Sequence, residues 1–123
     1  MELDATSLVA VERRVLERLV ADLEEAYAGR LQAVWLYGSC ARGERRREFS
    51  DVDVLVILDV ATPEGQRDVD SRVWDHAVAE DADPPMYSVR VRDLAWLAGR
   101  REIRSFFVME VERDRVILSG TAL

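Results

Sequence analysis

The chain has 123 residues and a formal net charge of −7, with 49% hydrophobic and 33% charged residues, which fits one globular domain over residues 1–123. The negative charge disfavours long DNA or RNA as a partner, because affinity for nucleic acid depends largely on Lys and Arg that neutralise phosphates. No apolar run approaches the roughly 18 residues of a membrane span and the first residues lack the pattern of a secretory signal, so we expect a cytoplasmic protein without membrane association.

The first predicted element is a long helix. Apolar residues recur at three- and four-residue spacings after Thr6 and Ser7, and either of these two residues could cap the helix. The charged residues between them, Glu12 included, are expected on the solvated face. Gly29 is a natural end for the helix.

Two strands and a second long helix follow. Apolar runs predict strands over 31–37 and 52–58, and the second run is so continuously aliphatic that burial on both faces is expected. A helix is predicted from Pro63, which is well placed in a first turn, to about Glu80. Its expected buried residues are Val69, Val73, Trp74, Ala77 and Val78.

The last third of the chain is less regular. We predict a strand over 86–91, a short helix that Asp93 caps and Gly99 ends, and a final strand over 115–118. Residues 101–112 read as a helix, with a hairpin as the rival interpretation because short apolar runs are ambiguous. The inward residues of that helix would be Ile103, Phe106, Phe107 and Val111. The expected fold class is therefore α/β (α+β), with a small mixed sheet flanked by helices.

Two aspartates stand at the start of the second strand. Strand side chains alternate between faces, so Asp51 and Asp53 project to the same side while Val52 points into the core. Strands tend to exclude Asp, and two carboxylates a few ångströms apart repel each other unless a cation lies between them. Mg²⁺ fits, because it is usually held by one or two carboxylates together with substrate phosphates.

The first strand ends in a Gly-Ser turn. Backbone N–H groups at Gly38 and Ser39, joined by the serine hydroxyl, can bind triphosphate oxygens. Arg42 could contact a nucleotide phosphate or could hold the loop through a carboxylate, and the sequence leaves both open. The run of three arginines over 45–47 reads as a solvated loop, although a basic loop beside such a site could also attract ATP.

Together these segments resemble the minimal nucleotidyltransferases of the DNA polymerase β superfamily. Their fingerprint is Gly-Ser, about ten residues that include Ala-Arg-Gly, and then Asp-x-Asp. Here Ala41-Arg42-Gly43 is present, and eleven residues separate Ser39 from Asp51, one more than the common form. The resemblance extends over residues 31–118.

The resemblance implies a nucleotidyltransferase fold and transfer of a nucleoside monophosphate, with AMP from ATP as the expected case, to a hydroxyl acceptor. Asp51 and Asp53 would be the catalytic and Mg²⁺-binding carboxylates, Gly38 and Ser39 would bind the β- and γ-phosphates, and Arg42 would support the loop. Minimal nucleotidyltransferases often act as antitoxins that pair with a HEPN-domain toxin and adenylylate its tyrosine. The alternative is a catalytically degenerate antitoxin that neutralises its partner by contact alone.

One part of the superfamily pattern is not found. Transfer generally uses a third carboxylate from a later strand, yet residues 86–91 contain no acid; Asp83 precedes them and Asp93 follows. The remaining reactive side chains read as structural: His76 has no metal-spaced companion, and Cys40 has no base near it and fits a small buried side chain. Trp35, Trp74 and Trp96 are expected in the core.

Overall fold

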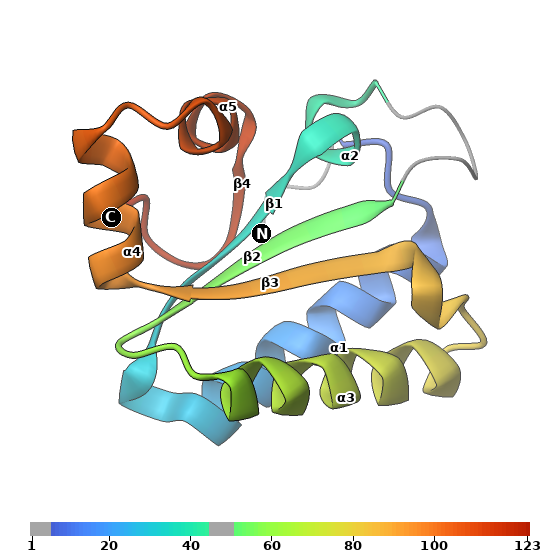
Figure 1. The fold of residues 1–123 in the computed structure, drawn as a ribbon. Coiled ribbons are helices and arrows are strands. Elements are labelled where there is room, and N and C mark those ends of the chain that lie inside the picture. Colours follow the sequence, from blue (N-terminus) through green and yellow to red (C-terminus); the bar gives the residue numbers. More distant parts are fainter. Residues whose placement is uncertain (1–5, 45–50) are drawn as a thin grey trace.

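The computed structural model describes residues 6–44 and 51–123 (Figure 1). Four strands form one mixed sheet in the order β3-β2-β1-β4, in which β1 is antiparallel to β2 and to β4, and β2 is parallel to β3. The strands are β1 Leu31–Tyr37, β2 Val52–Leu58, β3 Tyr87–Asp93 and β4 Val116–Gly120. The helices are α1 Ala10–Tyr27, α2 Gly38–Arg42, α3 Pro63–Ala79, α4 Leu94–Glu102 and α5 Phe106–Asp114, with short 3-10 turns at Ala28–Arg30 and Pro84–Met86. The predicted fold class is confirmed.

Helices cover both faces of the sheet. β2 is buried on both sides, as its aliphatic sequence predicted, and most of β1 is buried as well. On one face, α1 and α3 pack against every second residue of β2, from Val52 to Leu58. On the other face, α4 and α5 pack against Trp35, Leu55 and Ile57 (Figure 1). Asp53 is two residues before Leu55 and so shares its face. The Asp53 side chain therefore lies on the α4 and α5 side, at the end of the sheet where β1 runs into α2.

The start of α1 differs from the prediction. The helix begins at Ala10, with Val9 rather than Thr6 or Ser7 at the N-cap position. Glu12 reaches back to accept a hydrogen bond of 3.0 Å from the backbone N–H of Val9, and it is 7% exposed rather than solvated. A glutamate at the third helical position can satisfy a free N–H of the first turn, which explains why this acid is buried.

The buried stripe of α3 is narrower than expected. Val69, Val73 and Ala77 are buried, whereas Trp74 and Val78 are more than half exposed. Residues four apart share one helix face, and the next residue along lies about 100° around the axis. Trp74 and Val78 each follow a buried residue directly and are therefore turned away from the sheet.

The region after β3 also differs from the prediction. Asp93 caps α4 as predicted, accepting a hydrogen bond of 2.8 Å from the Trp96 N–H, but Gly99 lies inside α4 instead of ending it. Residues 106–114 form a helix, so the hairpin interpretation is wrong. Ile103 and Phe106 are exposed, against the prediction that they point inward. No helix in the described part of the chain is long and apolar enough to cross a bilayer.

Candidate active site

The two aspartates lie at the start of β2, at the end of the sheet where β1 runs into α2. Asp51 is exposed immediately before β2, and Asp53 is half-buried on the strand. Because β2 lies between β1 and β3, Asp53 is directly opposite Tyr37 on one side and Ser88 on the other. Asp53 is therefore less accessible than Asp51, because neighbouring strands enclose it.

Enclosure changes the chemistry of Asp53. The pKa of its carboxyl is raised to about 6, chiefly by burial and then by the nearby charge of Asp51, while Arg90 acts in the opposite direction. The same surroundings raise the pKa of Tyr37, first through burial and then through the charge of Asp53. Two carboxylates in a partly desolvated site form a set of oxygen donors that a divalent cation would stabilise.

The Gly-Ser turn lies against this carboxylate. Gly38 has φ of +76°, and a Cβ atom placed there would lie 2.7 Å from Asp53 Oδ2. Only glycine tolerates both the left-handed backbone and that close approach. The structure thus brings Gly38 and Asp53 together, with half-buried Ser39 next in the chain, as the motif predicted.

Replacing Gly38 with alanine should disturb both the turn and the carboxylate. We expect Gly38→Ala to lower the free energy of unfolding by about 1–2 kcal/mol or more, because a left-handed L-residue alone costs that much and Asp53 must also move. Chemical denaturation measures the change. Gly99→Ala is the matched control: its Cβ meets nothing within 4 Å on α4, so it should stabilise the helix by about 0.5–1 kcal/mol. Equal effects of the two substitutions would contradict this view of Gly38.

Cys40 connects the turn to the aspartate strand. Its side chain is fully buried, and Sγ contacts the backbone oxygen of Asp51 at 3.4 Å. The backbone oxygen of Cys40 also accepts a hydrogen bond of 2.9 Å from the Ser7 N–H. The prediction of a small buried side chain is confirmed, and Cys40 helps to fix the start of β2 beside α2.

Arg42 pairs with carboxylates. Its Nη1 donates to Asp114 Oδ2 of α5 at 2.9 Å, and its Nε donates to Glu44 Oε2 at 3.1 Å. Of the two roles left open by the sequence, the structure shows the one in which Arg42 holds its segment, here against α5. Contact with a nucleotide phosphate stays a prediction. The arginine run over 45–47 lies outside the described residues.

The strand expected to supply a third carboxylate presents none toward the site. β3 pairs with β2 so that Ser88 is opposite Asp53 and Arg90 opposite Leu55 on the same face. Asp93 is occupied at the far end of β3, where its two oxygens accept hydrogen bonds from the N–H groups of Ala61 and Trp96. Among the described residues, no three His, Cys, Asp or Glu side chains lie close enough together to hold a metal ion.

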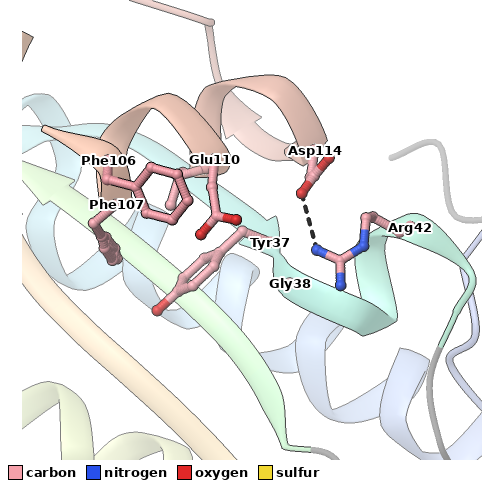
Figure 2. A pocket seen from close by; sticks show the side chains of 8 residues that line it. Tyr37, Gly38, Arg42, Phe106, Phe107, Glu110 and Asp114 are labelled. Carbon is pink, nitrogen blue, oxygen red and sulfur yellow. Dashed lines mark hydrogen bonds and ion pairs between the residues drawn. The ribbon is translucent and has the colours of Figure 1, made fainter. Parts of the chain in front are cut away.

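A pocket of about 310 Å³ opens beside the turn, between α2 and α5. It was not anticipated from the sequence, because Phe106 and Phe107 were both interpreted as core. A signal was available: Phe106, Glu110 and Asp114 are spaced four residues apart, so they share a helix face. An apolar residue and two acids on one face are untypical of a core-facing stripe. The pocket is lined by residues of β1, α2 and α5, namely Tyr37, Gly38, Arg42, Phe106, Phe107, Glu110, Val111 and Asp114 (Figure 2).

Comparisons with known proteins bear on the family and the fold. One curated relative is named "Putative protein adenylyltransferase MJ0604" and comes from Methanocaldococcus jannaschii. It is 39% identical to this chain over 49 residues. These residues are 40% of this chain and 48% of the relative, so the match spans about half of that protein.

Two solved structures share the fold. A toxin-antitoxin crystal structure with AMP-PNP has a TM-score of 0.52 at 24% identity, covering 85% of this chain and 73% of the other. A crystal structure described as a putative nucleotidyltransferase, of Sulfolobus solfataricus, has a TM-score of 0.51 at 20% identity, covering 89% and 83%. The model of the nucleotidyltransferase domain family matches residues 16–118. The chain therefore belongs to the nucleotidyltransferase domain family.

Proposed function

We propose that this chain transfers AMP from ATP, with Mg²⁺, to a tyrosine hydroxyl of a partner HEPN-domain toxin, and thereby acts as an antitoxin. The observation that carries the proposal is the contact between the Gly38 turn and the Asp53 carboxylate, with Asp51 beside it. A phosphate-binding turn and a pair of carboxylates have to adjoin if they are to hold a metal-bound triphosphate.

The donor set fits Mg²⁺. The carboxylates of Asp51 and Asp53 repel each other when both are ionised. Mg²⁺ commonly binds one or two carboxylates and completes its coordination shell with phosphates and water. When bound, the ion neutralises phosphate charge during transfer. The two aspartates are the residues that would hold it.

Phosphate binding is assigned to Gly38 and Ser39. Their backbone lies at the start of α2, beside the end of β2 that carries the aspartates, and Gly38 lacks the Cβ that would clash with the Asp53 carboxylate. In the proposed transfer, the acceptor oxygen forms a bond to the α-phosphorus and the bond from the α-phosphorus to the bridging oxygen breaks. Pyrophosphate leaves, and the hydroxyl proton passes to water. The protein's contribution is mainly positioning and charge stabilisation.

The acceptor is proposed from relatives rather than from contacts in this chain. One curated relative is named a protein adenylyltransferase, and a solved relative of the same fold is described as a toxin-antitoxin with AMP-PNP. A protein acceptor also agrees with an acidic chain that is a poor nucleic-acid partner.

The second candidate is an antitoxin that neutralises its partner by contact, without chemistry. It is favoured by the β3 strand, which presents Ser88 and Arg90 rather than an acid beside Asp53. On this reading the chain keeps the fold and binds its partner, while the hydroxyl of the acceptor is never deprotonated.

Binding of ATP tests the site on which the proposed transfer depends. We expect ATP to bind weakly without a divalent cation and at least tenfold more tightly with Mg²⁺, because Asp51 and Asp53 otherwise repel the triphosphate. Calorimetry with and without Mg²⁺ measures the difference. The double substitution Asp51→Asn and Asp53→Asn should remove the metal dependence. Equal affinity in the two conditions, or no binding in either, would contradict the assigned site.

A further inference from the structure

The pocket between α2 and α5 borders the candidate phosphate site. Gly38 contributes to the pocket wall and also lies against the Asp53 carboxylate, while Tyr37, another lining residue, is directly opposite Asp53 across the strands. A ligand held at Gly38 by its phosphates therefore has this hollow immediately beside it. The volume, about 310 Å³, is at the low end for small-molecule sites and fits one part of a nucleotide rather than all of it.

The walls of the pocket are aromatic. Phe107 is fixed among neighbours, with its ring 5.5 Å from the Tyr37 ring and 6.2 Å from the Trp96 ring, and the Arg90 guanidinium lies 5.0 Å from its centre. Phe106 differs, because 75% of it is exposed although it lines the pocket. An exposed phenyl ring beside a nucleotide site is a surface on which a base can stack.

The polar groups of the pocket do not suit phosphate. Asp114 is paired with Arg42 at 2.9 Å, so that arginine's charge is already balanced, and Glu110 adds a further negative charge. Glu110 projects from α5 toward Tyr37 (Figure 2), and its ion pair with Arg113 is long, at 3.8 Å. A carboxylate can only accept hydrogen bonds, so it favours an uncharged ring that carries N–H donors.

From this arrangement we infer that the pocket is a base-binding subsite for an aminopurine, with Phe106 stacking on the ring and Glu110 accepting a hydrogen bond from its amino group. The inference rests on the proposed function and adds to it the residues that distinguish nucleotides. Adenine and guanine share this chemistry, since both are two-ring bases that carry an exocyclic amino group.

The test compares ligands that share phosphates but differ in the base. Calorimetry with Mg²⁺ would measure Kd for ATP, GTP, purine riboside triphosphate, which has no amino group, and inorganic tripolyphosphate. Phe106→Ala should weaken the better of ATP and GTP by about 5- to 50-fold and leave tripolyphosphate unchanged. Because Phe106 is largely exposed, this substitution should not unfold the chain.

A second variant tests the carboxylate. The wild type should bind the preferred aminopurine about tenfold more tightly than purine riboside triphosphate, and Glu110→Leu should remove that preference. Met109→Ala is the control on the same helix, since Met109 is exposed and does not line the pocket.

The two levels of the proposal fail in different ways. Suppose that the wild type binds nucleotides, but Phe106→Ala lowers the affinities for nucleotide and tripolyphosphate equally or lowers neither affinity. The pocket then does not hold the base and the inference is overturned, although the proposed function stands. If Glu110→Leu keeps the preference for the amino group, the role of Glu110 is wrong. If the wild type binds no triphosphate with Mg²⁺, the proposed function and the inference both fail.

Discussion

Incubation of the chain with its partner toxin, ATP and Mg²⁺ should add about 329 Da to the partner for each AMP transferred, a mass that follows from the AMP group itself. Intact-mass spectrometry measures the addition. Asp53→Asn should abolish it, because the amide removes one of the two charges proposed to hold Mg²⁺ beside the Gly38 turn. The expected loss is at least a hundredfold in rate, comparable to removing one electrostatic stabiliser of a transition state.

The same experiment separates enzyme from contact-only antitoxin. A toxin that is neutralised with no mass change, and equally well by the Asp53→Asn variant, would refute the catalytic proposal. Met109→Ala, on the exposed face of α5, is the control for a substitution outside the site. It should transfer AMP as the wild type does unless the partner binds that face. The mass shift on the toxin, followed with time, distinguishes these results.

Asp53→Asn should also stabilise the fold at high pH, although it removes the activity. The folded carboxyl has a pKa of about 6, above the value of 3.8 for an unperturbed aspartate, chiefly because of burial and then because of Asp51. Between these two pH values the folded state binds more protons than the unfolded state, so wild-type stability falls as pH rises through that window. Asparagine cannot ionise and escapes this loss.

We expect the variant to gain about 1–2 kcal/mol over the wild type at pH 8, less than the full shift implies because water screens the half-exposed group. This corresponds to about 4–8 °C in Tm. The gain should shrink toward zero near pH 4, where the wild-type carboxyl is protonated in the fold. Thermal unfolding without divalent cations at the two pH values measures both.

Asp93→Asn is the control of opposite sign. Hydrogen bonds from the N–H groups of Ala61 and Trp96 lower the pKa of the Asp93 carboxyl, so its charge stabilises the fold above its unfolded pKa. Asparagine offers one acceptor oxygen where two are used, so this variant should melt below the wild type at pH 8. If Asp53→Asn lowers Tm at pH 8 as Asp93→Asn does, the account of Asp53 is wrong.

Local sequence determined the elements and the central motif. The aliphatic run of β2 and the apolar end of β1 define strands wherever they are placed, because such segments gain most when both faces are buried. The sequence could predict that Gly38 and Asp53 lie close in space. Gly38 follows the end of β1 and Asp53 is near the start of β2, and antiparallel pairing brings these two ends side by side.

Tertiary packing decided the surroundings of that motif. Whether Arg42 meets a phosphate or a carboxylate depended on α5, since its partner Asp114 is 72 residues away along the chain. The face of β3 beside Asp53 depended on the parallel register with β2, which places Ser88 and Arg90 there. A one-residue change of register would reverse which side chains face the site.

The helices show the same difference between what the sequence predicts and what tertiary packing decides. Periodicity predicts a helix for α3, and for α5 it favours a helix over 101–112 while leaving a hairpin open. An apolar residue at the border of a stripe can turn either way, so the pattern places Trp74 and Phe106 in the core although they are exposed. Apolar surface outside the stripe has no sequence signal of its own, because burial is decided by what packs against it. The sequence by itself thus determined the strands, the helices and the paired turn and carboxylates, whereas only the packing of α5 against α2 created the pocket beside them.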